Sequence, residues 1–265
     1  MNDTKIAELS VLCKDMGFEA PEAFIGNWML KNKITDEHLD SVISFMTNST
    51  NYKHERMVDN LIKKSRLPQV APKLFSNFQA RDLPESAQTT IKMLESLSFI
   101  EANRNIILIG TTGMGKTHLA QAIGNQCVRS GRSALFLTAS ELKGRIQRAL
   151  RSDHVSAFIN NIAKNTCLII DELGQTERYN KEETHLLFSI VERIYNKPGS
   201  VLVVTSNKES PEWEENFGDP VTFECILDRL YDTALAVSFS GTSYRGRMRT
   251  DESWNFDNPL NMNLT

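Results

Sequence analysis

The segment Ile106–Thr117 constrains the fold of this chain more than any other stretch. It reads Ile-Ile-Leu-Ile-Gly-Thr-Thr-Gly-Met-Gly-Lys-Thr, which is a short apolar run followed by the pattern G-x-x-x-x-G-K-T. Glycines in such a loop let backbone N–H groups turn inward around a polyphosphate, because a Cβ would obstruct that turn. The alternative is a glycine turn that binds nothing, but a strand is expected before the loop and a helix after it. The segment therefore predicts a strand, a phosphate-binding loop and a helix whose N-terminus faces the phosphates.

Two side chains of the loop have specific expected roles. Lys116 places a positive charge on the β- and γ-phosphates, and the Thr117 hydroxyl ligates Mg²⁺. We expect His118 and His185 to have structural roles, because no spacing typical of a catalytic triad or a zinc site accompanies them. The residues expected to contact the nucleotide are Gly110, Thr111, Thr112, Gly113, Met114, Gly115, Lys116, Thr117 and His118.

The composition argues against a strongly basic protein, a membrane-spanning protein and a disulfide-bonded protein. A net charge of −3 on 265 residues means that binding to nucleic acid would have to use local basic patches. No apolar run approaches the roughly 18 residues of a membrane helix, and residues 1–16 do not resemble a signal peptide. The four cysteines are far apart, so we expect reduced thiols in a cytoplasmic protein.

Hydrophobic periodicity divides the chain into parts. Residues 1–66 are expected to form a small domain of four helices, the last of which is basic. Residues 67–84 contain three prolines and are expected to form a linker arm. Phe75 and Phe78 are expected to pack this arm against the next domain. The predicted parts are a helical domain at 1–66, the arm at 67–84, an ATPase domain at 85–250 and a polar tail at 251–265.

The pattern within 85–250 alternates between helices and short β-rich strands. After a first helix at 86–99, strands are expected at 105–109, 133–137, 166–170, 201–205 and 234–239. Thr138 and Glu141 have the spacing of a capping box, so a helix begins there. Apolar strands separated by helices predict a five-stranded parallel sheet that is covered on both faces.

Two adjacent carboxylates follow the third strand. Asp171 would hold Mg²⁺ and Glu172 would orient and deprotonate the attacking water. The alternative interpretation is that these two acidic residues only begin a loop and have no role in an ATP site. Ligands of open α/β sheets bind at the carboxyl ends of the strands. With the phosphate loop expected on a neighbouring strand, we favour the ATP site.

Two further residues are candidates for catalysis. Asn207 follows the fourth strand and could bind the γ-phosphate or the water, although an asparagine turn is the alternative. Arg229 lies on a predicted helix and could act as an arginine finger on the ATP of a neighbouring subunit. An ordinary ion pair would explain Arg229 as well.

Basic residues at two other places are candidates for binding phosphate groups. Arg245 could contact the nucleotide or DNA. A helix after the capping box carries a stripe that suits a phosphate backbone, although a solvated helix face would look the same. The stripe consists of Lys143, Arg145, Arg148 and Arg151.

Taken together, these motifs resemble the IstB family of AAA+ helper ATPases, which is related to the DnaC helicase loaders. The resemblance covers about residues 53–249, and its most specific parts are Glu-Trp-Glu-Glu-Asn-Phe-Gly-Asp-Pro and Gly-Thr-Ser-Tyr-Arg. The remaining motifs are Gly-Met-Gly-Lys-Thr-His-Leu-Ala, Ile-Ile-Asp-Glu-Leu-Gly, Thr-Ser-Asn and Ile-Leu-Asp-Arg-Leu. Thr111 and Thr112 stand where the family commonly has two prolines.

The resemblance implies an AAA+ P-loop fold and a DNA-stimulated, oligomerisation-dependent ATPase that uses ATP and Mg²⁺. Its implied partners are double-stranded DNA, a transposase and other copies of the chain, with no membrane. It implies that Asn207 is sensor 1 and that Arg229 acts in trans, and it favours DNA contact by residues 143–151. A DnaC-like loader of a replicative helicase is the alternative, and an ATP-dependent filament that uses hydrolysis only to disassemble is a third hypothesis.

Overall fold

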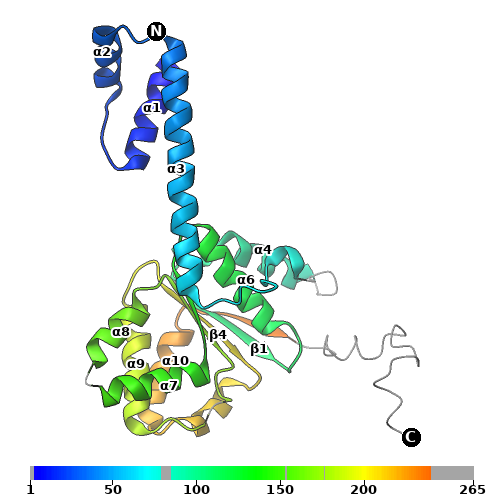
Figure 1. The fold of residues 1–265 in the computed structure, drawn as a ribbon. Helices are drawn as coiled ribbons and strands as arrows, with labels where there is room; N and C mark the ends of the chain where they lie inside the picture. Colours follow the sequence, from blue (N-terminus) through cyan, green and yellow to red (C-terminus); the bar gives the residue numbers. More distant parts are fainter. Residues whose placement is uncertain (1–2, 79–84, 153, 176, 240–265) are drawn as a thin grey trace, which may run out of the picture. The chain divides into compact units, whose positions relative to one another are not determined.

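The computed structural model describes residues 3–78, 85–152, 154–175 and 177–239 (Figure 1). The chain divides into two compact units, Met1–Asn60 and Leu61–Thr265. Arg245 and the polar tail at 251–265 lie outside the described residues. No helix in the described part is long and apolar enough to cross a membrane.

The N-terminal unit is helical, as predicted. Its elements are α1 (Asp3–Met16), α2 (Glu22–Asn32) and the beginning of α3 (Asp36–Ser65). Its core consists of Ile6, Leu9, Cys13, Ala20, Ile25, Met29, Leu39 and Met46. The expectation of separate third and fourth helices is wrong, because α3 is one helix of 30 residues. The polar stretch at 47–52 contains neither glycine nor proline, so it holds no residue that breaks a helix, and its weak helix propensity alone does not end α3.

A five-stranded sheet lies at the centre of the second unit. The strands are β1 (Ile106–Gly110), β2 (Ala134–Thr138), β3 (Cys167–Asp171), β4 (Val201–Ser206) and β5 (Leu235–Phe239). All neighbouring pairs are parallel, which confirms the predicted fold class.

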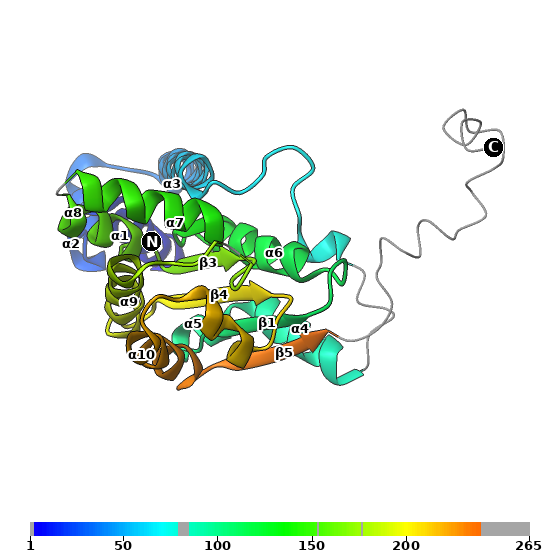
Figure 2. The same cartoon turned by 90° about the horizontal axis from the view of Figure 1, so that it is seen from below.

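The strand order is β2-β3-β4-β1-β5, and Figure 2 shows four of these strands side by side. The phosphate-loop strand β1 and the acidic strand β3 were expected to be neighbours, and this expectation is wrong because β4 lies between them. The end of β4 therefore stands between the phosphate loop and the two carboxylates.

Helices cover both faces of the sheet. On one face, α7 (Ala139–Arg151), α8 (Val155–Ala163), α9 (Lys181–Tyr195) and α10 (Pro220–Tyr231) enclose a core with alternate strand residues such as Ile107 and Ile170. On the other face lies α6 (Lys116–Arg129), where a Cβ on Gly124 would come within 2.7 Å of Ile169. Helix α8 was not predicted. Burial of apolar strand residues on both faces explains their nearly continuous runs.

Two short elements precede the sheet. The helix expected at 86–99 is divided into α4 (Glu85–Ser96) and α5 (Ser98–Glu101), because Leu97 adopts a left-handed conformation with φ of 60°. The arm contains the 3₁₀ turn η1 (Phe75–Asn77), and a second 3₁₀ segment, η2 (Ser210–Asn216), follows β4.

Candidate functional site

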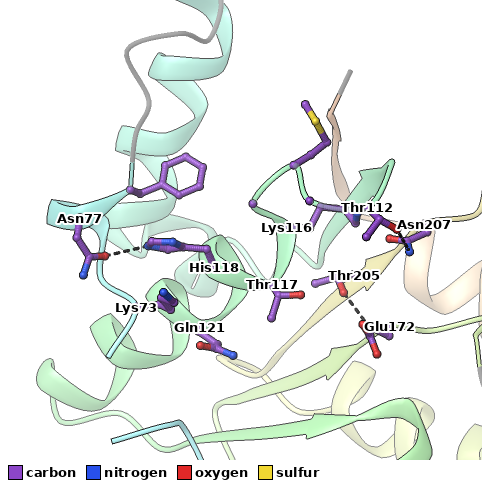
Figure 3. A pocket seen from close by; sticks show the side chains of 14 residues that line it. Lys73, Asn77, Thr112, Lys116, Thr117, His118, Gln121, Glu172, Thr205 and Asn207 are labelled. Carbon is purple, nitrogen blue, oxygen red and sulfur yellow. Dashed lines mark hydrogen bonds between the residues drawn. The ribbon is translucent and has the colours of Figure 1, made fainter. Parts of the chain in front are cut away.

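The carboxyl ends of β1, β3 and β4 meet in a cavity of about 460 Å³ (Figure 3). The lining residues come from the loop after β1, the start of α6, the ends of β3 and β4, and the arm. They are Lys73, Asn77, Phe78, Thr112, Gly113, Met114, Gly115, Lys116, Thr117, His118, Gln121, Glu172, Thr205 and Asn207. The structure thus brings most of the predicted site residues to one cavity, with Asp171 adjacent.

The loop between β1 and α6 has the shape that its glycines allow. Gly113 and Gly115 have φ values of 83° and 91°, in the left-handed region that favours glycine. Gly115 directly precedes α6, so the free N–H groups at the helix start face the cavity. This arrangement can cradle an anionic phosphate chain.

Lys116 is buried inside this loop. Its Nζ donates hydrogen bonds to the carbonyl oxygens of Gly110 and Thr111, at 2.6 and 2.8 Å. Burial lowers the pKa of the Lys116 ammonium, whereas the nearby carboxylates of Asp171 and Glu172 favour its charged form. A positive charge is therefore held in the loop where a polyphosphate would lie.

Two oxygen groups suited to Mg²⁺ meet beside the loop. The Thr117 hydroxyl donates to Asp171 Oδ1 at 3.0 Å, and the Thr205 hydroxyl donates to the same oxygen at 2.6 Å. Mg²⁺ is commonly held by one or two such protein oxygens together with substrate phosphates and water. No group of three or more His, Cys, Asp or Glu side chains that could hold a metal ion by itself occurs in the described part of the chain. The donor set of Thr117 and Asp171 therefore fits a Mg²⁺ that arrives with a nucleotide.

Glu172 directly follows β3 with an unusual backbone. Its φ is 61°, and its N–H donates to Thr205 Oγ1 at 2.9 Å (Figure 3). A glutamate rarely adopts this left-handed conformation, and surrounding contacts must hold it there. Sequence reasoning missed Thr205, which bonds the Asp171 carboxylate and the Glu172 backbone N–H. The only signal was its place in the motif Thr-Ser-Asn at a strand end.

Asn207 reaches the phosphate loop from the end of β4. Its Nδ2 donates to the Thr112 hydroxyl at 2.8 Å, so the expected strand-end amide does line the cavity. This contact links the end of β4 to the loop after β1.

The arm forms the opposite wall of the cavity. The Phe78 ring lies against the loop, since a Cβ on Gly115 would come within 3.1 Å of it. His118 anchors the arm, with Nε2 at 2.9 Å from Asn77 Oδ1 and 3.2 Å from the Leu74 carbonyl oxygen. His118 therefore joins α6 to the arm, in line with a structural role.

The anchoring by His118 predicts a pH-dependent stability. Burial chiefly lowers the pKa of His118 below 6.5, although the hydrogen bond to Leu74 opposes this. Just below pH 6.5 the unfolded chain binds this proton more readily than the folded chain, so the free energy of unfolding falls as the pH decreases there. Thermal melting across this range should show the loss in wild type and a smaller loss in His118→Gln. An imidazole midpoint at or above 6.5 in an NMR titration would contradict the prediction.

Arg229 does not line the cavity of its own chain. Its guanidinium bonds Glu192 Oε1 and the Cys225 carbonyl oxygen, each at 3.1 Å, and lies 4.7 Å from the centre of the Phe188 ring. The ordinary ion pair that the sequence left open is therefore present. A role in trans is compatible with the position of Arg229 outside its own cavity.

The basic stripe on α7 does not form one exposed face. Lys143 is buried, pairs with Glu177 at 3.5 Å and lies over the Tyr179 ring. Arg148 and Arg151 are exposed, whereas Arg145 is half-buried. The inclusion of Lys143 in a DNA-facing stripe is wrong, because the helix turns this residue toward the core.

A further exposed arginine, Arg66, lies beside this helix. Arg66 pairs with Glu141 at 2.7 Å, where Glu141 also closes the capping box with Thr138. Burial and the positive charges of Arg66 and Arg148 lower the pKa of Arg145. Three guanidinium groups, of Arg66, Arg145 and Arg148, thus lie near one another beside α7. His185, by contrast, bonds Asp219 at 2.8 Å, away from the cavity.

Comparison with known proteins places this arrangement in context. The model of the family described as IstB-like ATP binding protein matches residues 30–252. The chain is 34% identical over 195 residues to an ATP-binding protein of insertion sequence IS21 from Pseudomonas aeruginosa, covering 74% of this chain and 72% of that protein. It is 30% identical over 231 residues to its counterpart in insertion sequence IS232 from Bacillus thuringiensis subsp. berliner, covering 82% and 90%.

Solved structures share the fold at lower identity. AMPPCP-bound DnaA from Aquifex aeolicus matches with a TM-score of 0.56 and 17% identity, covering 69% of this chain and 54% of that one. The DnaC helicase loader matches with a TM-score of 0.53 and 18% identity, covering 63% and 97%. Both likenesses concern the AAA+ fold.

Proposed function

Because this chain belongs to the IstB-like ATP binding protein family, we propose that it is a cytoplasmic ATPase that assembles on double-stranded DNA and helps a transposase select or act on its target. One observation carries the ATPase proposal. A phosphate-loop lysine, a hydroxyl–carboxylate pair and a second carboxylate converge on one cavity at the edge of the sheet. Relatives described as ATP-binding proteins of insertion sequences support the transposition proposal.

The residues around the cavity have different roles in the proposed hydrolysis. The loop N–H groups and Lys116 bind and orient the phosphates, and Lys116 offsets charge that develops on the γ-phosphate. When bound at Thr117 and Asp171, Mg²⁺ supplies further charge neutralisation between the phosphates. Glu172 takes a proton from the attacking water, and Asn207 holds that water or a γ-oxygen by its amide. The left-handed backbone of Glu172 places its carboxylate on the cavity wall.

Assembly would complete the site. No arginine lines the cavity among the described residues. Arg229 lies elsewhere on the surface of its chain, with its side chain part-exposed. We propose that Arg229 leaves Glu192 and stabilises the transition state in a neighbouring subunit, which makes hydrolysis depend on self-association.

The three arginines beside α7 are the surface that we assign to DNA. Arg66 and Arg148 lie near enough to Arg145 for their positive charges to lower its pKa, and Arg66 and Arg148 are exposed. A cluster of like charges is favourable beside phosphates because it displaces condensed counterions. Two of these three belong to the predicted stripe, and Arg66 is an addition from the structure.

A DNA-stimulation assay tests the proposed function. We expect ATP hydrolysis by the wild-type chain to rise on addition of double-stranded DNA, and the stimulation to weaken with increasing salt. Replacement of Arg148 with alanine should reduce the stimulation and leave the DNA-free rate unchanged. Absence of hydrolysis by the wild type in the presence of DNA would overturn the ATPase proposal.

The N-terminal unit favours a protein partner. Residues 1–60 contain ten Asp and Glu but six Lys and Arg, so this unit is acidic. It also exposes large apolar side chains, namely Phe18, Phe24, Leu30, Phe45 and Tyr52. An acidic surface with exposed aromatics suits a protein and repels DNA.

Which protein binds there separates the main proposal from its alternative. A replicative helicase would make the chain a loader, and a transposase would make it a transposition helper. Pull-down of the full chain with each purified partner distinguishes the two. A chain that binds neither and polymerises with ATP would favour the filament hypothesis.

A further inference from the structure

A buried tryptophan lies directly behind the candidate ATP site. Trp213 in η2 has no exposed surface, and its indole N–H donates to Ser206 Oγ at 2.9 Å and to the Lys208 carbonyl oxygen at 3.0 Å. A buried indole N–H usually finds such a partner. The indole thus bonds the residue that directly precedes Asn207, a candidate catalytic residue.

The Ser206 hydroxyl makes three hydrogen bonds. It donates to the Leu173 carbonyl oxygen at 2.7 Å, and it accepts from Trp213 and from the Lys208 N–H, the latter at 3.1 Å. Ser206 has no exposed surface, so water cannot replace these bonds. One hydroxyl thus ties together the chain after β3, the chain after β4 and η2.

These two chain segments carry the groups that would act on water. Glu172 directly precedes Leu173 on one segment, and Asn207 directly follows Ser206 on the other. Thr205 adds further ties at this point, because it accepts hydrogen bonds from the Glu172 and Leu173 N–H groups at 2.9 and 2.8 Å. The paired strands β3 and β4 end directly before these residues, and the Asn207 amide also bonds Thr112. Beyond the ends of the paired strands, the bonds of Thr205 and Ser206 hold the segment of Glu172 against the segment of Asn207.

The backbone makes room for the indole at the same point. Gly174 has φ of 82°, and a Cβ there would come within 2.7 Å of Trp213 Cδ1. The tryptophan therefore packs directly on the segment that follows Glu172. Tight packing of this kind transmits small displacements instead of absorbing them.

We propose that Ser206 and Trp213 are positioning residues for hydrolysis, and that they set the distance between Glu172 and Asn207. This inference rests on the proposed ATPase function. The hydroxyl of Ser206 fixes the two segments, and the indole holds that hydroxyl in its orientation toward Leu173. Neither side chain lines the cavity, so neither contributes to nucleotide binding.

Replacement of Ser206 with alanine tests the proposal. We expect kcat for ATP to fall by about 10- to 100-fold, because small misplacement of catalytic groups has effects of that order. The Kd of a non-hydrolysable ATP analogue should stay at the wild-type value, because the loop residues and Lys116 are untouched. A loss confined to kcat indicates a defect that arises after binding.

The chain offers a matched control on the same strand. Ser200 directly precedes β4 at its opposite end, is also buried, and its hydroxyl has no hydrogen-bond partner among the described residues. Ser200→Ala should retain the wild-type kcat and Kd. Thermal melting of both variants shows whether each is folded at the assay temperature.

Trp213→Phe provides a second, independent variant. It keeps an aromatic ring but removes the N–H, so it should also lower kcat without changing the Kd of the analogue. Because Ser206 retains Leu173 as a partner in this variant, we expect a smaller loss than in Ser206→Ala. The double variant should be no slower than Ser206→Ala alone, since both changes act on one contact.

The outcomes separate this inference from the proposed function. If the wild type hydrolyses ATP and both Ser206→Ala and Trp213→Phe match it in kcat, the positioning role is wrong. If either variant loses analogue binding and kcat together, the residues serve the general fold and the positioning role is also wrong. If the wild type itself shows no hydrolysis with DNA, the proposed function fails first.

Discussion

Arg229→Ala should lower the turnover of ATP by about 10³- to 10⁵-fold at saturating protein, the range found when an arginine finger is removed. The reason is that negative charge grows on the γ-phosphate in the transition state, and Lys116 with Mg²⁺ offsets only part of it. Analogue binding should be unchanged, because Arg229 does not line the cavity of its own chain. Steady-state hydrolysis and analogue titration measure the two quantities.

Stability must be separated from catalysis in this variant. Arg229 pairs with Glu192, and the side chains are 27% and 42% exposed, so the pair is screened and contributes little to folding. Glu192→Gln is the matched control, because it removes the same ion pair but leaves the guanidinium available. We expect Glu192→Gln to remain active. Equal loss in both variants would assign the effect to packing of α9 and α10, and an active Arg229→Ala would rule out the finger.

Glu172→Gln should lower turnover by about 10²- to 10⁴-fold, the usual contribution of a general base. Glutamine has the same size and can still orient water, but it cannot accept the proton. Nucleotide affinity should be retained, so the variant would accumulate ATP-bound subunits. Single-turnover hydrolysis with pre-bound ATP measures the chemical step directly.

Glu177→Gln is the control for the loss of one negative charge near this site. Glu177 is 94% exposed and pairs with Lys143 outside the cavity, so its neutralisation should leave turnover unchanged. A Glu172→Gln enzyme as fast as wild type would show that another group accepts the proton.

Mixing the two inactive variants distinguishes action in trans from action in cis. An Arg229→Ala subunit keeps its base, and a Glu172→Gln subunit keeps its arginine. If the finger acts between subunits, a mixed assembly contains sites with both groups, and activity returns in proportion to such pairs. If Arg229 acts within its own chain, every mixture stays inactive.

Local motifs allowed much of this fold to be predicted from the sequence. The loop at Gly110–Thr117 and the capping box at Thr138 are determined by neighbouring residues, so both were recognised. The long-range arrangement was less accessible. The insertion of β4 between β1 and β3 depends on how helices of both faces pack, which strand sequences do not encode.

The burial and the contacts of individual side chains were still harder to predict from the sequence. The burial of Lys143 depends on the rotation of α7 against the core, and a charge pattern alone cannot give it. The contacts of Thr205, Ser206 and Trp213 join positions that are apart in the chain, so no local pattern indicated them. Trp213 belonged to the most specific segment of the resemblance, yet its link to the carboxylates became visible only in three dimensions.

The tie between Arg229 and its own α9 has a consequence for the geometry of any open assembly. If Arg229 acts in trans as proposed, each subunit would supply its arginine on one side and receive one on another, so the two ends of a linear array would be chemically different. The subunit at one end would then receive no arginine and keep its ATP, whereas the arginine at the other end would stay paired with Glu192, as it is in the single chain. Growth and loss of subunits would then occur at different ends, which gives the array a direction along the DNA.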